Sequence, residues 1–144
     1  MLKIISHRGN LSGKSIDENK PSHIENALSK GFDVEVDVWC VDNVLYTGHD
    51  IHKYRTDIEF LNNPKIWCHA KTVESLEVLM KNNIHTFWHE TDKFTITSRG
   101  IPWCYPGNYI NTGITVELSI KKEIPSCLGI CTDHPLRWRK NNTR

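Results

Sequence analysis

Short apolar runs alternate along this chain with polar, glycine-rich segments. The runs with the length and composition of buried strands are residues 3–6, 44–47, 66–68, 84–88, 114–118 and 128–131. Residues 94–97 and 101–105 flank Ser98-Arg99-Gly100, which predicts a hairpin with glycine at its turn. The polar segments between these runs predict loops, and residues 51–63 form a loop or an irregular helix.

Two segments instead show the spacing of amphipathic helices. Ser22 and Glu25 predict a capping box at the start of the first helix, which Gly31 ends. Thr72 caps the second, at residues 73–81. The apolar face predicted for this second helix consists of Val73, Leu76, Leu79 and Met80.

Residues 32–38 alternate strictly between apolar and acidic side chains. Phe32, Val34, Val36 and Val38 share one face, and Asp33, Glu35 and Asp37 share the other. In a half-exposed strand such an acidic face is simply solvated. In a closed barrel it points into the interior, where the acids must be paired or bound to metal. The sequence leaves both interpretations open.

Composition narrows the class of protein. The 144 residues suit one domain with a sizeable core, and 18 basic against 17 acidic residues argue against a nucleic-acid partner. The five cysteines are odd in number and contain no Cys-x-x-Cys pair, which indicates reduced thiols. The first apolar run is too short for a signal peptide or a membrane span, so we expect a cytoplasmic protein without an integral membrane segment.

Three clusters of reactive side chains follow apolar runs: His7-Arg8-Gly9, Glu35-Val36-Asp37 and Gly48-His49-Asp50. Catalytic groups of α/β enzymes collect where strands end in loops. Histidine titrates at a pKa of about 6.5, arginine binds phosphate oxygens bidentately, and carboxylates bind hard cations. Together these residue types predict a phosphoryl-transfer site.

The order of motifs along the chain resembles the glycerophosphodiester phosphodiesterase family, within the phosphatidylinositol-phospholipase-C-like phosphodiesterases. The matching segments are His7-Arg8-Gly9, Glu18-Asn19, Glu35-x-Asp37-Val38, Gly48-His49-Asp50, Lys71 and Gly129-Ile130-Cys131-Thr132-Asp133-x-Pro135. His-Arg-Gly alone would be a weak signal, but the ordered set spans almost the whole chain.

The resemblance implies a TIM-type (β/α) barrel that hydrolyses glycerophosphodiesters with a divalent metal ion, Mg²⁺ or Ca²⁺. By position, Glu35 and Asp37 would hold the metal and His7 and His49 would form the acid/base pair. Arg8 and Lys71 would then bind the phosphate.

Two features depart from the family pattern. The third acidic metal ligand usually found two residues before the lysine is replaced by His69, which would favour Mn²⁺ or Zn²⁺. The chain is also short, because a typical barrel has about 250 residues. We therefore expect an α/β fold, a compact or incomplete barrel with several helices replaced by short loops. Apolar barrel surface left uncovered would be buried by the five tryptophans or in a homodimer.

The remaining candidates are assigned more loosely. Residues expected to line the pocket are Glu18, Asn19, His89, Glu90, Trp103 and Asp133. Asp92 is expected in a polar turn. We expect residues 1–136 to form the barrel domain and residues 137–144 a basic, polar tail.

The leading hypothesis is a metal-dependent phosphodiesterase acting on a small phosphodiester substrate. The alternatives are a non-catalytic phosphometabolite-binding barrel and a phosphodiester lyase or transferase.

Overall fold

The computed structural model describes residues 1–142. Its strands are β1 (Lys3–His7), β2 (Asp33–Val41), β3 (Val44–Thr47), β4 (Tyr54–Thr56), β5 (Ile66–Ala70), β6 (Thr86–Phe87), β7 (Phe94–Ile96), β8 (Pro102–Cys104), β9 (Ile114–Val116) and β10 (Gly129–Thr132). Its helices are α1 (Pro21–Ser29), α2 (Ile58–Leu61), α3 (Val73–Lys81) and α4 (Pro135–Asn142). Within these residues, no helix combines the length and the apolar character that crossing a membrane requires.

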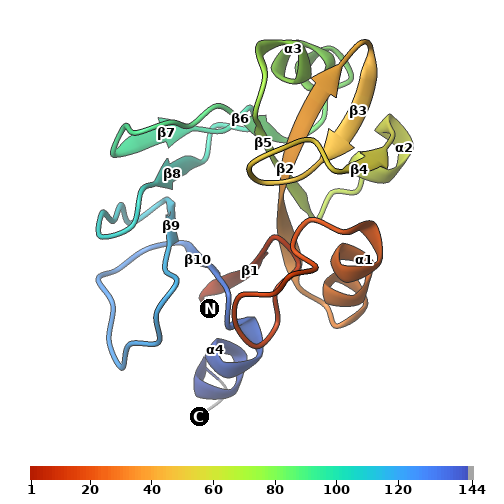
Figure 1. Cartoon of the computed structure of the whole chain (residues 1–144). Coiled ribbons are helices and arrows are strands. Elements are labelled where there is room, and N and C mark those ends of the chain that lie inside the picture. The colour runs from red at the N-terminus through yellow and green to blue at the C-terminus, as the bar shows by residue number, and fades with distance from the viewer. Residues whose placement is uncertain (143–144) are drawn as a thin grey trace.

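The strands form one strongly curled sheet that makes an incomplete barrel (Figure 1). Parallel pairing runs through β6, β5, β2, β1, β10, β9 and β8, and β7 is added antiparallel to β8. The two ends of the sheet meet where the Ser98 amide donates to the carbonyl oxygen of Thr86 over 2.7 Å. The predicted hairpin at β7 and β8 is confirmed, as is the α/β barrel with helices replaced by loops.

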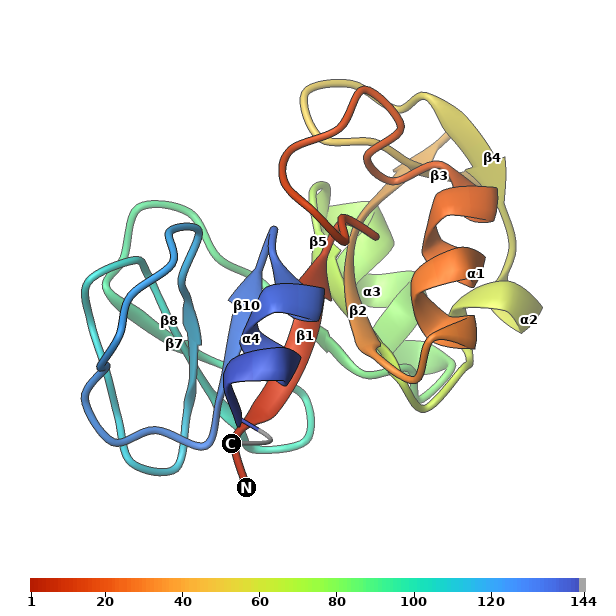
Figure 2. The ribbon, with the colours of Figure 1, turned by 90° about the horizontal axis from the view of Figure 1, so that it is seen from below.

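Few helices cover the outside of this barrel. Helix α1 packs on β2, α3 packs on β2, β5 and β6, and α4 packs on β1. Beside β7, β8 and β9, the described part of the chain places loops instead of helices (Figures 1 and 2). The described connections that lead into and out of these three strands contain no helix, which helps the fold to fit into 144 residues.

The acidic face of β2 points into the barrel. Val34, Val36 and Val38 are fully buried in the core cluster that packs against α1 and α3. Glu35 and Asp37 project to the opposite face and are only 3% and 0% exposed. Of the two interpretations of the alternating pattern, the structure supports the interior one.

Aromatic residues fill much of the barrel interior near Glu35 and Asp37. Phe87 stacks on Trp103 with ring centroids 4.4 Å apart, and Trp67 lies 5.8 Å from Trp103. Trp138 of α4 is also buried. Trp67 and Trp103 thus lie inside the barrel, contrary to the expectation that the tryptophans cover its outer surface, whereas Trp138 does lie on the outside, in the helix that packs on β1. All five cysteines are free thiols, as expected.

The predicted helices exist, but some of their details differ. Helix α1 begins at Pro21, since proline suits the first helical position, and Ser22 therefore lies inside the helix. No side chain among the described residues caps this helix, so the predicted capping box of Ser22 and Glu25 is wrong. Thr72 does cap α3. However, Val73 and Met80 of its predicted apolar face are exposed. The residues that α3 buries are Ser75 and Leu79.

Three segments differ from the sequence-based expectation. Residues 51–63, expected as loop or irregular helix, form strand β4 and the one-turn helix α2. The strand expected at residues 84–88 pairs only over Thr86 and Phe87. Of the segment expected as a basic tail, 137–144, residues 137–142 belong to α4, which begins at Pro135 and is anchored to the barrel by Trp138. Residues 143–144 lie outside the described part.

Candidate metal centre and active site

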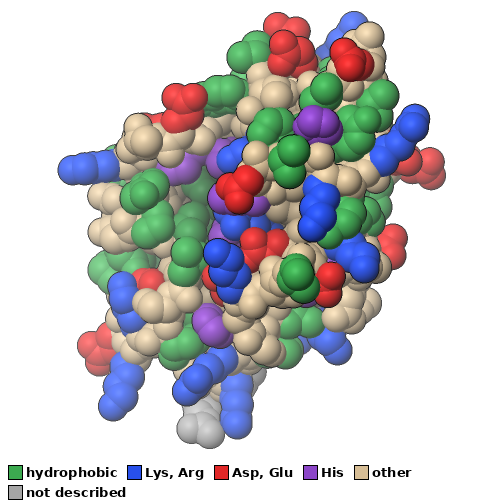
Figure 3. All heavy atoms as spheres, in the orientation of Figure 1, with side chains coloured by type: hydrophobic (Ala, Val, Ile, Leu, Met, Phe, Trp, Pro, Cys, Tyr) green, Lys and Arg blue, Asp and Glu red, His purple; other side chains and the backbone are tan. Residues whose placement is uncertain are grey.

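A cavity of about 700 Å³ opens at the end of the barrel where the parallel strands finish. Figure 3 shows histidine, basic and acidic side chains gathered at the middle of this face. The predicted site residues that line the cavity are His7, Arg8, Glu35, His49, Lys71, His69, His89, Glu90 and Trp103. The rest of the wall is largely apolar and includes Phe87, Val116 and Leu118.

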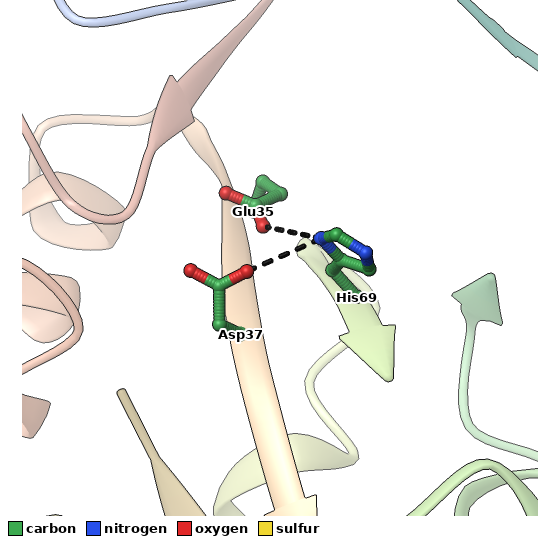
Figure 4. A group of neighbouring side chains, drawn as sticks. All are labelled: Glu35, Asp37 and His69. Atoms are coloured by element: carbon green, nitrogen blue, oxygen red, sulfur yellow. Dashed lines mark ion pairs between the residues drawn. The ribbon is translucent and has the colours of Figure 1, made fainter. Parts of the chain in front are cut away.

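Glu35, Asp37 and His69 converge from two neighbouring strands (Figure 4). Asp37 of β2 is paired in register with His69 of β5. Nδ1 of His69 lies 3.2 Å from Oδ1 of Asp37 and 3.9 Å from Oε1 of Glu35. One potential ligand atom from each residue lies within 4.8 Å of the others, a spacing that could hold a metal ion.

Two contacts fix the imidazole of His69. Its Nε2 lies 2.8 Å from the carbonyl oxygen of His89, and because a carbonyl can only accept, Nε2 carries a hydrogen. The ring also stacks on Phe87 at an interplanar angle of 14°. In the neutral tautomer the lone pair of Nδ1 therefore faces the two carboxylates, which is the form that binds a metal.

The carboxylates themselves lack partners for some of their oxygen atoms. Glu35 Oε2 and Asp37 Oδ1 are buried and accept no hydrogen bond from any described residue. Buried carboxylate oxygens are normally satisfied, so this arrangement calls for a cation or a proton between the side chains. Two hard oxygen donors and one imidazole nitrogen fit a divalent metal ion.

The two acids differ in their electrostatic environment. Burial, reinforced by the charge of Asp37, raises the pKa of Glu35 well above its ordinary value. Burial would also raise the pKa of Asp37, but the imidazole of His69, with Nδ1 3.2 Å from Oδ1, and the charge of Arg8 outweigh it and hold this pKa well below its ordinary value. Asp37 is therefore the permanently charged member of the group.

Arg8 binds this acidic group from the loop after β1. Its backbone adopts a left-handed conformation with φ of 60°, which is rare for residues other than glycine, and its amide donates to the carbonyl oxygen of Glu35 over 2.9 Å. The guanidinium lies 3.0 Å from Asp37 and 3.1 Å from Glu18. The charges of Asp37 and Glu35 raise the pKa of Arg8 despite its burial.

His7 forms a second functional group beside the acids. Its Nδ1 lies 2.8 Å from Oδ1 of Asp133, which also accepts a hydrogen bond of 2.9 Å from Asn10. Nε2 of His7 lies 3.8 Å from Glu35 Oε2. Asp133 is charged, because the hydrogen bonds from His7 and Asn10 outweigh its burial and lower its pKa. With Nδ1 engaged, Nε2 of His7 is available for proton transfer.

His49 reaches the same cavity from the loop after β3. Gly48 shapes this loop with φ of 155°, and a Cβ there would collide with the carbonyl oxygen of Ile51. The Trp39 indole donates to the Gly48 carbonyl oxygen over 2.7 Å. Partial burial and the charge of Arg8 lower the pKa of His49, so its imidazole is neutral at pH 7.

Three residues predicted to line the pocket do not line the cavity but lie directly behind its wall. Asn19 donates to Asp37 over 2.9 Å, Glu18 binds Arg8, and Asp133 binds His7. Asn10, which joins Glu18 to Asp133, was not predicted, and no local sequence signal marks it. These residues act on the site by holding the side chains that line it.

Comparison with known proteins supports the fold. No family model and no curated protein matches the sequence. A solved structure described as glycerophosphodiester phosphodiesterase from Agrobacterium tumefaciens str. C58 matches with a TM-score of 0.62 over 100% of each chain, at 11% sequence identity. At that identity the likeness establishes the shared barrel fold, and the chemistry of this chain must be argued from its own residues.

Proposed function

We propose that this protein is a metal-dependent phosphodiesterase, a phosphoric diester hydrolase that acts on glycerophosphodiesters or a related small phosphodiester. The observation that carries the proposal is that His7 and the group of Glu35 and His69 face one cavity, with Asp37 directly behind. Acid/base and metal-binding side chains in one cavity are what phosphodiester cleavage needs. The fold shared with a structure described as a glycerophosphodiester phosphodiesterase supports the same substrate class.

The cationic groups of the cavity would neutralise the negative charge of the phosphate. A divalent ion held by Glu35, Asp37 and His69 would supply Lewis-acid stabilisation of the phosphate oxygens. Lys71 and Arg8 also line the cavity and add positive charge for the phosphate. Because Arg8 is held by Glu18 and Asp37, its guanidinium is in place before the substrate arrives.

The two histidines provide acid/base catalysis. Both have Nδ1 within 2.8 Å of an aspartate oxygen, Asp133 for His7 and Asp50 for His49, which leaves each Nε2 for proton transfer. One imidazole takes the proton from the attacking hydroxyl as its oxygen bonds to phosphorus, and the other protonates the departing alkoxide. The attacking group is a neighbouring hydroxyl of the substrate, giving a cyclic phosphate that water opens, or water itself.

A direct assay tests this proposal. Purified protein is incubated with glycerophosphocholine, glycerophosphoethanolamine and an aryl phosphodiester, each with Mg²⁺, Ca²⁺, Mn²⁺ or Zn²⁺. We expect metal-dependent turnover that His7→Ala and Glu35→Ala abolish. Glu77→Ala, which removes an exposed glutamate of α3, should leave turnover unchanged.

The outcomes separate the alternatives. No metal-dependent turnover, or turnover unaffected by both substitutions, contradicts the hydrolase. Binding of glycerol phosphates without turnover would indicate a phosphometabolite-binding barrel. A cyclic phosphate as the final product would indicate a lyase, and transfer of the phosphoryl group to an added alcohol would indicate a transferase.

A further inference from the structure

The metal-facing orientation of His69 depends on a backbone group outside the sheet. Its Nε2 hydrogen is accepted by the carbonyl oxygen of His89, 20 positions away. Strand β6 consists only of Thr86 and Phe87, and its pairing with β5 ends at Phe87. The sheet therefore does not fix the position of the His89 carbonyl.

Asp92 holds the turn that carries this carbonyl. Its Oδ2 lies 2.9 Å from Nδ1 of His89, and its Oδ1 accepts a hydrogen bond of 3.1 Å from the amide of Glu90. Nε2 of His89 is buried and makes no hydrogen bond to any residue in the range 1–142, so Asp92 is the only hydrogen-bonding partner of that ring. The carboxylate of Asp92 therefore links the side chain of His89 to the amide of Glu90 within this turn.

Two further hydrogen bonds anchor the turn at its start, Trp88, and just beyond its end, Lys93. The Thr95 hydroxyl donates to the carbonyl oxygen of Trp88 over 2.8 Å, and the Tyr105 amide donates to that of Lys93 over 2.9 Å. These bonds hold the turn against β7 and β8. They leave the His89–Glu90 peptide, which contains the His89 carbonyl, to be positioned by Asp92 through the amide of Glu90.

We propose that Asp92 is a positioning residue of the metal centre, resting on the metal site proposed above. By fixing the turn at residues 88–92, it holds the His89 carbonyl where it accepts the Nε2 hydrogen of His69, which leaves Nδ1 of His69 for the metal. Groups that orient a metal-bound imidazole in this way typically change metal affinity about 10- to 100-fold when removed.

The test measures metal binding instead of turnover. Calorimetric titration with Zn²⁺ and Mn²⁺ should show about tenfold weaker binding by Asp92→Ala. Asp92→Asn should bind within about twofold of the unchanged protein, because its amide oxygen still accepts from Glu90 and its NH₂ group can donate to the other tautomer of His89. Asp57→Ala is the matched control, since Asp57 also accepts from a backbone amide, that of Phe60, but at the exposed start of α2. It should leave affinity unchanged.

A spectroscopic signature separates positioning from general destabilisation. In the Zn²⁺-loaded protein, nitrogen NMR should show the His69 proton on Nε2 and slow exchange of that proton. Asp92→Ala should speed the exchange, and Asp57→Ala should not. If Asp92→Ala does not fold, His89→Ala replaces it, because it removes the same ring hydrogen bond and keeps the one from Glu90.

Failure of this inference can be told apart from failure of the proposed function. Unchanged affinity and exchange in Asp92→Ala overturn the positioning role and leave the hydrolase standing if the unchanged protein turns over substrate. Weakened affinity in a protein without turnover supports Asp92 and contradicts the hydrolase. Absence of any metal binding that depends on Glu35 overturns both.

Discussion

Nδ1 of His7 lies 2.8 Å from Oδ1 of Asp133, although 126 positions separate the two residues along the chain. They meet because β1 and β10 are parallel neighbours with Ser6 in register with Thr132. Each of the two residues thus follows the last pair in the register between β1 and β10. Pairing of the first strand with the last therefore brings His7 and Asp133 together.

Asp133→Asn tests this relationship. The amide can still occupy the space, but it can donate to Nδ1 and so favour the tautomer in which Nε2 carries the hydrogen. We expect kcat to fall about 100-fold or more with little change in KM or metal affinity. Steady-state kinetics would check this, with Asp17→Asn, at an exposed aspartate, as the control. A rise in KM with kcat unchanged would instead indicate a role in substrate binding.

The sequence was informative wherever local pattern decides structure. Alternation along β2 placed Glu35 and Asp37 on one face, and it could not say whether that face was solvated, because this depends on whether the sheet closes. Thr72 marked the start of α3 correctly because its cap lies within three residues of it. Local hydrogen bonds of this kind are visible in a short window of sequence.

Features that depend on distant packing were not predictable. Asn10 gains its role only when β1 and β10 pair, and Asp92 gains its role because the turn after β6 meets His69 of β5. Helix α4 has a polar, basic sequence, and the burial of Trp138 and Pro135 stabilises it. Tertiary contacts outweigh local propensity at each of these places.

His69→Glu should change the metal preference. A carboxylate in place of the imidazole would give three hard oxygen ligands, which favour Mg²⁺ and Ca²⁺ over Zn²⁺. We expect the ratio of the Zn²⁺ and Mg²⁺ dissociation constants to shift toward Mg²⁺ by at least about tenfold. Calorimetric titration of both proteins measures this ratio. An unchanged ratio would place His69 outside the metal ligands.

Arg8→Met should destabilise the metal-free protein. Its guanidinium is the cation nearest Asp37, and breaking a buried ion pair costs about 3 to 5 kcal/mol because a buried charge is left without a partner. We expect a loss of about 3 kcal/mol in the free energy of unfolding, partly recovered on adding metal. Urea unfolding with and without Mn²⁺ tests this, and Arg55→Met, at an exposed arginine of β4, is the control. Equal losses in the two variants would contradict the role of Arg8.

His85 should make stability depend on pH in the weakly acidic range. The ring is 4% exposed beneath Trp67, and burial lowers its pKa from 6.5 to about 4. Its Nε2 lies 2.7 Å from the Thr97 hydroxyl oxygen, which already accepts from the amides of Arg99 and Ile101, so the hydroxyl donates to a neutral ring.

Because the folded-state pKa of His85 lies below its unfolded value, the unfolded chain binds the proton more tightly. The contribution of this residue is fully present above pH 6.5 and is lost as the pH falls toward 4. By about pH 4.5 the loss should reach about 2 to 3 kcal/mol. Urea unfolding across this range would show a steeper pH dependence in the unchanged protein than in His85→Gln, whose amide can accept the same hydrogen bond without titrating. Parallel curves for the two proteins would show that His85 binds its proton equally well in the folded and unfolded states, which contradicts a lowered pKa in the folded protein.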